Sequence, residues 1–326
     1  MSENALATSQ PTAPVPVHAP DPTQHGRSLN RFTTVLLIGY LGFIVALMVL
    51  KRAAITADVF VVFVSVIAIM LGRGKAFIRD WAPFLLIFLA WEAMRGVANQ
   101  FGAEVQSDAV IAVERFISFG YVPPVELQRL LHTPGVVGPL EMITAAIYAA
   151  HFLLPLAIAF VLWLKRRTAY YHYVIALMLM SFAQFFTAIV MPVAPPRYAA
   201  LYGEALQVVD LGSVVAQQTG IGVLSWAYHN MIGNPVAAFP SLHAAYPILA
   251  YLFLRDHWPR AAWAMLAYTV AVWFSIMFLG HHYLIDALGG LAYAVAAYLV
   301  VRSAVSGRIG QWWRARRRGA SEPGRV

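Results

Sequence analysis

Gly280-His281-His282-Tyr283-Leu284-Ile285-Asp286 stands at the start of an apolar run that continues to Val301. A transmembrane helix needs about 20 mostly apolar residues, and this run is long enough to form one. Histidine and aspartate are costly inside a bilayer, so they are rarely kept there without a task. The stretch therefore predicts a membrane-spanning helix with chemically active side chains at one end.

The apolar pattern recurs along the chain. Of its 326 residues 60% are hydrophobic and 12% are charged, whereas a soluble domain is roughly 25% charged. We expect an all-α fold, a polytopic transmembrane helical bundle of about eight spans. The candidate spans are Phe32–Leu50, Thr56–Leu71, Trp81–Ala98, Leu140–Leu164, Tyr171–Val190, Ser241–Leu254, Ala261–Leu279 and His282–Val301.

Three parts of the chain differ in composition. Residues 1–31 are rich in Pro, Ser, Thr and Ala and lack apolar periodicity, which predicts a disordered cytoplasmic tail. Residues 32–303 hold the spans and are expected to form one transmembrane domain. Residues 304–326 are rich in arginine and are expected to form a basic cytoplasmic tail. The chain has no cysteine, which excludes disulfides and thiolate metal ligands.

The net charge of +8 comes from short basic clusters between the apolar runs. In an eight-span arrangement Arg73–Arg79, Lys165–Arg167 and Arg255–Arg260 fall on one side with the arginine-rich tail, and Lys51-Arg52 alone disagrees. Basic loops mark the cytoplasmic side of a membrane protein. We therefore expect both termini in the cytoplasm, the bilayer as a partner, and no nucleic acid.

This orientation places two polar motifs on the non-cytoplasmic face of the cell membrane. One is the turn around His281, and the other is Phe239-Pro240-Ser241-Leu242-His243. The long connections Asn99–Pro139 and Pro192–Pro240 lie on the same face. Amphipathic segments within the first connection are expected to lie in the interface and roof a site. These segments are Asp108–Phe119 and Pro124–Leu131.

The motif around Ser241 has the features of a helix start. Pro240 suits that position because its missing N–H costs nothing there. Ser241 and His243 then lie in the first turn, where exposed N–H groups and the helix dipole favour an anion. A bound phosphate would receive a hydrogen bond from Ser241 and have His243 in reach as a general acid or base. A plain helix start with an interfacial histidine explains this short motif as well.

The later motif pairs an imidazole with a carboxylate. His282 and Asp286 are one helical turn apart and are expected on one face of a helix. The carboxylate would hold one ring nitrogen and leave the other free to attack phosphorus. His281 points elsewhere and is expected to contact substrate. Gly289-Gly290 permits close packing of a neighbouring helix. A structural His–Asp pair is the alternative.

These residues resemble the type 2 phosphatidic acid phosphatase superfamily, and within it the branch of inositol phosphorylceramide synthase-like phosphotransferases. The family's Pro-Ser-x-His is matched by Pro240-Ser241-Leu242-His243. Its later Ser-Arg-x5-His-x3-Asp is matched by Ser275, His282 and Asp286. The resemblance implies a helical membrane enzyme in which His282 is the nucleophile, Asp286 orients it and His243 is the acid.

Departures from the phosphatases favour the synthase-like branch. Ile276 stands where the phosphatases have arginine, and their upstream Lys-x6-Arg-Pro has no good match. Met191-Pro192-Val193-Ala194-Pro195-Pro196-Arg197-Tyr198 precedes the first histidine motif instead, and the doubled histidine also resembles that branch. Arg197 is expected to replace the missing cation, because a guanidinium binds phosphate through two parallel hydrogen bonds.

Other polar residues lie at membrane depth. Glu92 and Arg95 are one turn apart, which suggests an ion pair within the helix or contact of Arg95 with a substrate headgroup. His151 and Gln184 are expected to make hydrogen bonds between helices.

The main prediction is a lipid phosphotransferase, similar to inositolphosphotransferases, that forms a phosphohistidine and needs no metal or other cofactor. A phospholipid or isoprenoid phosphate would be the donor, and a lipid or alcohol the acceptor. One alternative is a phosphatase for lipid phosphates or polyprenyl diphosphates. Others are a metal-dependent membrane enzyme, with His243, His281, His282 and Asp286 as ligands, and a non-catalytic transporter.

Overall fold

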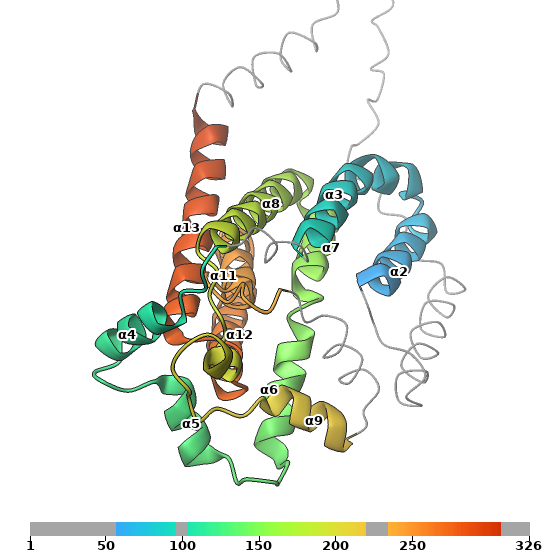
Figure 1. Cartoon of the computed structure of the whole chain (residues 1–326). Coiled ribbons are helices and arrows are strands. Elements are labelled where there is room, and N and C mark those ends of the chain that lie inside the picture. The colour runs from blue at the N-terminus through green and yellow to red at the C-terminus, as the bar shows by residue number, and fades with distance from the viewer. Residues whose placement is uncertain (1–56, 96–102, 220–233, 308–326) are drawn as a thin grey trace, which may run out of the picture.

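The computed structural model describes residues 57–95, 103–219 and 234–307, and the predicted span Phe32–Leu50 lies outside them. The described residues form helices and a single isolated β-bridge, so the predicted all-α fold is confirmed (Figure 1). The helices are α2 Ala57–Met70, α3 Gly74–Arg95, α4 Ser107–Ile117, α5 Pro123–Leu131, α6 Pro139–Ala150, α7 Leu154–Lys165, α8 Arg167–Val190, η2 Pro196–Leu201, α9 Leu211–Thr219, α11 Leu242–Leu254, α12 Pro259–Phe278 and α13 Leu284–Ser306.

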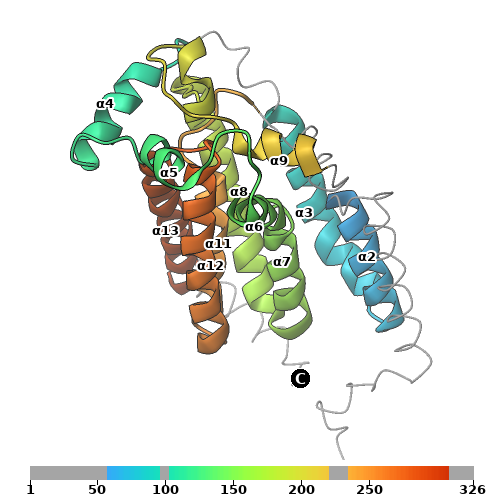
Figure 2. The same cartoon turned by 90° about the horizontal axis from the view of Figure 1, so that it is seen from below.

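Helix α11 lies at the centre of the bundle, packed against α7, α8, α12 and α13 (Figures 1 and 2). Its residues from Ala244 to Ala250 are all buried. A helix that is apolar on every side belongs in the interior of a bundle, because no face of it is suited to water. The first histidine motif, at the start of α11, is therefore held inside the protein.

Gly290 lets α13 approach α11 closely. A β-carbon built at this position would lie 2.3 Å from the backbone oxygen of Ser241, and one at Gly289 would lie 2.6 Å from the ring of Phe239. Both distances are shorter than real side-chain contacts allow. The packing role predicted for Gly289-Gly290 is confirmed, and the contact joins the two histidine motifs.

By length and composition, three helices among the described residues can cross a membrane: α8, α12 and α13. Helices α6 and α7 become a fourth if they are counted together, but they are bent by 49°. The predicted span Leu140–Leu164 is thus present as two helices with a bend between them. Pro155 explains the break, because a proline ring clashes with the carbonyl four residues earlier, here that of His151.

Helices α4, α5 and α9 lie across one end of the bundle, as Figure 2 shows. The helices expected within Asp108–Phe119 and Pro124–Leu131 are confirmed as α4 and α5. Helix α5 is fastened by Gln128, whose side-chain nitrogen donates to the carbonyls of Val209 and Phe278 at 2.8 Å each. These three helices cover the end at which α12 finishes and α11 and α13 begin.

Candidate active site

His243, His282 and Asp286 form a chain of contacts beneath this roof. His282 Nδ1 lies 3.2 Å from Asp286 Oδ2, and His282 Nε2 lies 2.9 Å from His243 Nδ1. The side chains of His282 and Asp286 are almost fully buried. The structure therefore brings together the three residues predicted to be catalytic.

The protons along this chain follow from its chemistry. A carboxylate only accepts hydrogen bonds, so His282 Nδ1 carries the proton toward Asp286. In a neutral imidazole the other nitrogen then has a lone pair, so His282 Nε2 accepts from His243 Nδ1. If His243 moves away, the lone pair on His282 Nε2 becomes available to a substrate. His243 carries a proton on Nδ1.

A turn, rather than a shared helical face, brings His282 to Asp286. Helix α13 begins at Leu284, so His282 precedes it, and the prediction that both residues lie on one helix is wrong in this detail. Asp286 Oδ2 also accepts the N–H of Tyr283 at 2.9 Å. A carboxylate at this position caps the helix start, and the same oxygen thus fixes the turn that carries His282.

The first motif also begins its helix one step later than expected. Ser241 is the N-cap of α11, its hydroxyl accepts the N–H of Ala244 at 3.3 Å, and Pro240 stands before the cap. The backbone N–H of Ser241 donates to the Asp286 carbonyl at 2.9 Å. His243 therefore lies in the first turn, as predicted, and its position is tied to the helix that carries Asp286.

Arg197 and His281 lie together, joined by Asp210. Arg197 Nε is 3.4 Å from one Asp210 oxygen, and His281 Nε2 is 3.5 Å from the other. The Arg197 N–H donates to the Gly280 carbonyl at 3.1 Å, so the loop carrying Arg197 is held to the turn carrying His281. The structure thus places Arg197 and His281, two of the four predicted substrate-binding residues, on either side of the Asp210 carboxylate and next to the turn that carries His282.

Burial lowers the pKa of His281 to about 4, and the positive charge of Arg197 adds to this effect while Asp210 opposes it. The imidazole of His281 is therefore neutral at physiological pH. A neutral ring can donate one hydrogen bond and accept another, which suits contact with a substrate hydroxyl or phosphate oxygen.

The break between α6 and α7 supplies aromatic walls around His243. The Tyr148 ring stacks on it with centroids 5.1 Å apart, and the His151 ring lies 4.2 Å away. Tyr148 also meets His281 edge to face, with ring centroids 4.4 Å apart.

His151 and Gln184 were predicted to make hydrogen bonds between helices. His151 Nδ1 is hydrogen-bonded to the Tyr148 carbonyl in its own segment, and the Gln184 side chain donates to the Ala237 carbonyl in a loop at 3.4 Å. The Gln184 bond therefore differs from the predicted bond between helices.

Glu114 reaches from the roof to the start of α13. Its two carboxylate oxygens accept the N–H groups of Leu284 and Ile285 at 2.8 and 2.9 Å, and the side chain is fully buried. Burial raises the pKa of Glu114, and the nearby charge of Asp286 acts in the same direction. Helix α4 thereby fills the anion-binding end of α13, so the open anion-binding end in this site is that of α11.

Residues 108–300, more than half of the chain, match the model of a family described as the PAP2 superfamily. The chain belongs to the PAP2 superfamily. This finding confirms the resemblance recognised from Pro240-Ser241-Leu242-His243 and from His282 and Asp286, and the matched range contains all of these residues.

Three curated relatives of this PAP2 protein are synthases. It is 33% identical over 117 residues to the inositol phosphorylceramide synthase catalytic subunit of Saccharomyces cerevisiae, covering 33% of this chain and 29% of that one. It is 28% identical over 173 residues to the inositol phosphorylceramide synthase of Candida albicans, covering 51% and 36%. It is 28% identical over 144 residues to the phosphoinositol dihydroceramide synthase of Bacteroides thetaiotaomicron, covering 41% and 46%. The PAP2 protein thus spans less than half the length of these relatives. No solved structure matches it.

Two further site hypotheses concern Arg95 and a metal. Arg95 is the last residue of α3 and its side chain lies outside the described part, so its substrate contact stays a prediction, while Glu92 is exposed. No group of three or more His, Asp or Glu side chains within the described ranges is arranged to hold a metal ion. In this PAP2 site His282 instead turns its two nitrogens toward Asp286 and His243.

Sequence reasoning did not select Glu114, Tyr148 or Asp210 for this PAP2 site. Their contacts with the segment from Gly280 to Asp286 span long stretches of the chain, and Glu114 and Leu284, for example, are 170 positions apart. Glu114 offered one signal, since it is an acidic residue on the inner side of an amphipathic segment. Burial of such a residue requires a partner.

We expect Glu114→Gln to destabilise the protein by about 1–3 kcal/mol, because the amide nitrogen cannot accept the second backbone N–H and leaves it buried without a partner. Unfolding of the detergent-solubilised protein measures this loss. Glu104→Gln is the matched control, since Glu104 is exposed. Equal stability of the two variants would contradict the capping role of Glu114.

We expect the folded protein to lose stability as the pH falls from 6.5 toward 4. The unfolded chain protonates His281 near its ordinary pKa of 6.5, whereas the folded chain does so only near 4, so acid favours unfolding over this range. The melting temperature in detergent, measured at pH 7 and pH 5, should fall less for His281→Gln than for the wild type. His257→Gln serves as the matched control. An unchanged acid dependence in His281→Gln would contradict the neutral state of His281.

Proposed function

We propose that this PAP2 protein is an integral-membrane lipid phosphotransferase that moves a phosphoinositol-type headgroup from a phospholipid to a lipid alcohol. The observation that carries the proposal is the contact chain from Asp286 through His282 to His243. It supplies an oriented nucleophile and a proton carrier within one site. The names of the synthase relatives support the choice of headgroup.

The chemistry balances with these residues alone. In the first step the Nε2 lone pair of His282 forms a bond to phosphorus and the bond from phosphorus to the leaving oxygen breaks. His243, which enters the step as the imidazolium with both nitrogens protonated, gives one proton to that oxygen and is left neutral. In the second step the acceptor hydroxyl oxygen attacks phosphorus, His243 takes the hydroxyl proton, and the bond to His282 breaks. The intermediate is a phosphohistidine, and the enzyme returns to its initial protonation state.

Binding of the phosphate must separate His282 from His243, because the two reacting nitrogens are 2.9 Å apart. Cationic and N–H groups near them can stabilise the phosphate oxygens. Arg197 would exchange Asp210 for the phosphate, and the N–H groups of Leu242 and His243 at the start of α11 would donate to it as well. These groups act where charge develops in the transition state.

We also propose that the site faces the non-cytoplasmic side of the cell membrane. Helix α11 begins at the site and ends before Arg255, and α8 begins at Arg167 and ends before the loop of Arg197. The basic junctions α7–α8 and α11–α12 therefore lie at the end of the bundle away from His243. Basic connections favour the cytoplasm, so the opposite end is expected outside.

Product analysis tests the function. Purified protein in liposomes would receive phosphatidylinositol labelled in the headgroup, together with a long-chain lipid that carries a free hydroxyl. We expect the label on the acceptor lipid. Release of labelled inositol phosphate without transfer would instead make the protein a hydrolase, and an inert protein with every donor tested would contradict both.

We expect Asp286→Asn to lower kcat by about 10⁴-fold while the fold is kept, as for other histidine–aspartate pairs in enzymes. The single amide oxygen can still cap Tyr283, but then the amide does not accept the proton of His282 Nδ1, and the ring loses its productive tautomer. Label transfer and melting temperature together measure the effect. Asp256→Asn, at the far end of α11, is the control, and near-normal turnover in Asp286→Asn would refute the orienting role.

A further inference from the structure

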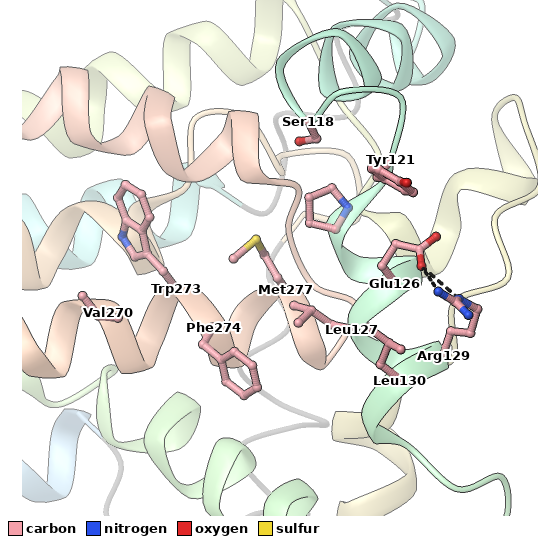
Figure 3. Close-up of a pocket in the computed structure, with 11 residues that line it drawn as sticks. Ser118, Tyr121, Glu126, Leu127, Arg129, Leu130, Val270, Trp273, Phe274 and Met277 are labelled. Atoms are coloured by element: carbon pink, nitrogen blue, oxygen red, sulfur yellow. Dashed lines mark hydrogen bonds and ion pairs between the residues drawn. The ribbon is translucent and has the colours of Figure 1, made fainter.

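A groove lies between the roof helix α5 and the span α12. Its volume is about 710 Å³, within the range of about 300–1,000 Å³ that small-molecule sites occupy. Figure 3 shows Val270, Trp273, Phe274 and Met277 lining it from α12, with Leu127 on the facing α5. We call this the α5–α12 groove. Its walls are mostly apolar.

The groove continues the surface that α12 turns toward the bilayer. Trp263 and Val270 are about two-thirds exposed and recur at helical spacing on this span. Phe274 and Met277 extend the same stripe by one and two turns, where α5 covers it. A hydrocarbon chain in the membrane can therefore pass along α12 into the groove without leaving an apolar surface.

Helix α12 connects the groove to the residues of the candidate active site. Trp273 Nε1 donates to the carbonyl of Ala244, the residue after His243, at 3.4 Å. The carbonyl of Ile276, next to Met277, accepts the N–H groups of His281 and His282 at 2.8 and 3.1 Å. The helix that lines the groove is thus bonded both to the residue after His243 and to the turn that carries the proposed nucleophile.

The charge of the groove indicates which lipid it fits. Its charged lining residues are Glu126 and Arg129, which form an ion pair. Arg129 Nε and Nη2 lie 2.9 and 2.6 Å from the same oxygen, Glu126 Oε2 (Figure 3). Ser118 and Tyr121 add neutral hydroxyl groups at the rim. Arg197, the cation suited to phosphate, is not among the lining residues. The groove is therefore neutral overall, apolar along its length and able to form hydrogen bonds at its end.

We propose that the α5–α12 groove binds the acceptor, an uncharged long-chain lipid with a free hydroxyl group. This inference rests on the proposed phosphotransfer, because it assigns the acceptor to the groove and the anionic donor to Arg197. The acceptor chain lies along Val270 and Phe274, and the hydroxyl end lies toward the turn of His282.

Two measurements on the full-length protein in liposomes test this assignment. The first uses a hydroxyl-bearing lipid with a photoreactive diazirine in its chain, and mass spectrometry locates the adducts after irradiation. We expect adducts on the segment from Val270 to Met277. Excess unlabelled lipid alcohol should remove them, and excess phosphatidylinositol should leave them in place.

The second measurement is the kinetics of the Val270→Trp variant, whose larger side chain fills the groove. We expect KM for the acceptor to rise about tenfold, with kcat and KM for the donor unchanged. Val300→Trp, an exposed valine of α13, is the matched control.

The outcomes separate this proposal from the proposed function. Adducts in the groove without any label transfer would support the lipid site and contradict the transferase. Label transfer with adducts elsewhere, and with Val270→Trp behaving as Val300→Trp, would overturn the groove alone. Displacement of the probe by phosphatidylinositol, but not by lipid alcohol, would also overturn it, because the groove would then belong to the donor.

Discussion

His282→Ala should abolish label transfer, with a fall in kcat of more than about 10⁴-fold, the scale seen when an enzyme's reacting histidine is removed. The reason is specific to this site. His282 Nε2 is held 2.9 Å from His243 Nδ1, and its other nitrogen is held by Asp286, so His282→Ala removes the carboxylate-oriented lone pair on which the first step depends. The measurement is transfer of labelled headgroup by purified protein at matched concentrations.

The controls for this variant separate chemistry from folding. His257→Ala removes a histidine near the far end of α11 and should keep wild-type turnover. Acid-labile phosphate bound to the wild-type protein during turnover, and absent from His282→Ala, would identify the proposed intermediate. Near-normal turnover in His282→Ala would refute the mechanism as written.

Gly290→Ala should destabilise the protein by about 3 kcal/mol or more, the upper part of the range for an overpacked core. In an exposed helix the same change normally stabilises by about 0.5–1 kcal/mol. Here the added methyl group would lie 2.3 Å from the Ser241 carbonyl oxygen and 3.3 Å from both Ala244 Cβ and the Ala245 nitrogen. Two of these atoms are backbone atoms, so relief requires α11 and α13 to move apart.

The effect of Gly290→Ala is measured as a fall in melting temperature and in label transfer. Ala292→Val adds methyl groups to an exposed position of the same helix and is the matched control. If Gly290→Ala melted at the wild-type temperature, the close approach of the two helices would be wrong. Because separation of the helices also moves His243 from His282, activity should fall even at temperatures where the variant is folded.

The sequence predicted the helices and the clustering of His243, His282 and Asp286 because both depend on local patterns. Apolar runs give the approximate positions of α8, α12 and α13, and the two histidine motifs carry their residues at fixed spacing. The contact between His282 and Asp286 was expected for an incorrect reason, a shared helical face. The real cause is the capped turn at Tyr283, which puts the same two residues together.

The remaining parts of the site depend on contacts between distant segments. Asp210 meets Arg197 and His281 only after a loop folds back on the bundle, and Tyr148 reaches His243 because of the break between α6 and α7. Pro155 was a local signal for that break that a count of apolar residues overlooks. Where a side chain acts across the bundle, its residue type alone does not indicate its partner.

Two of the three roof helices, α4 and α5, are bonded to opposite flanks of the turn that carries His281 and His282. Glu114 of α4 holds the N–H groups just after the turn, and Gln128 of α5 holds the Phe278 carbonyl just before it. A displacement of α4 or α5 would therefore also displace the turn that carries His282, the proposed nucleophile. We therefore expect reactants to enter the proposed site from the side, out of the bilayer, and not through the roof.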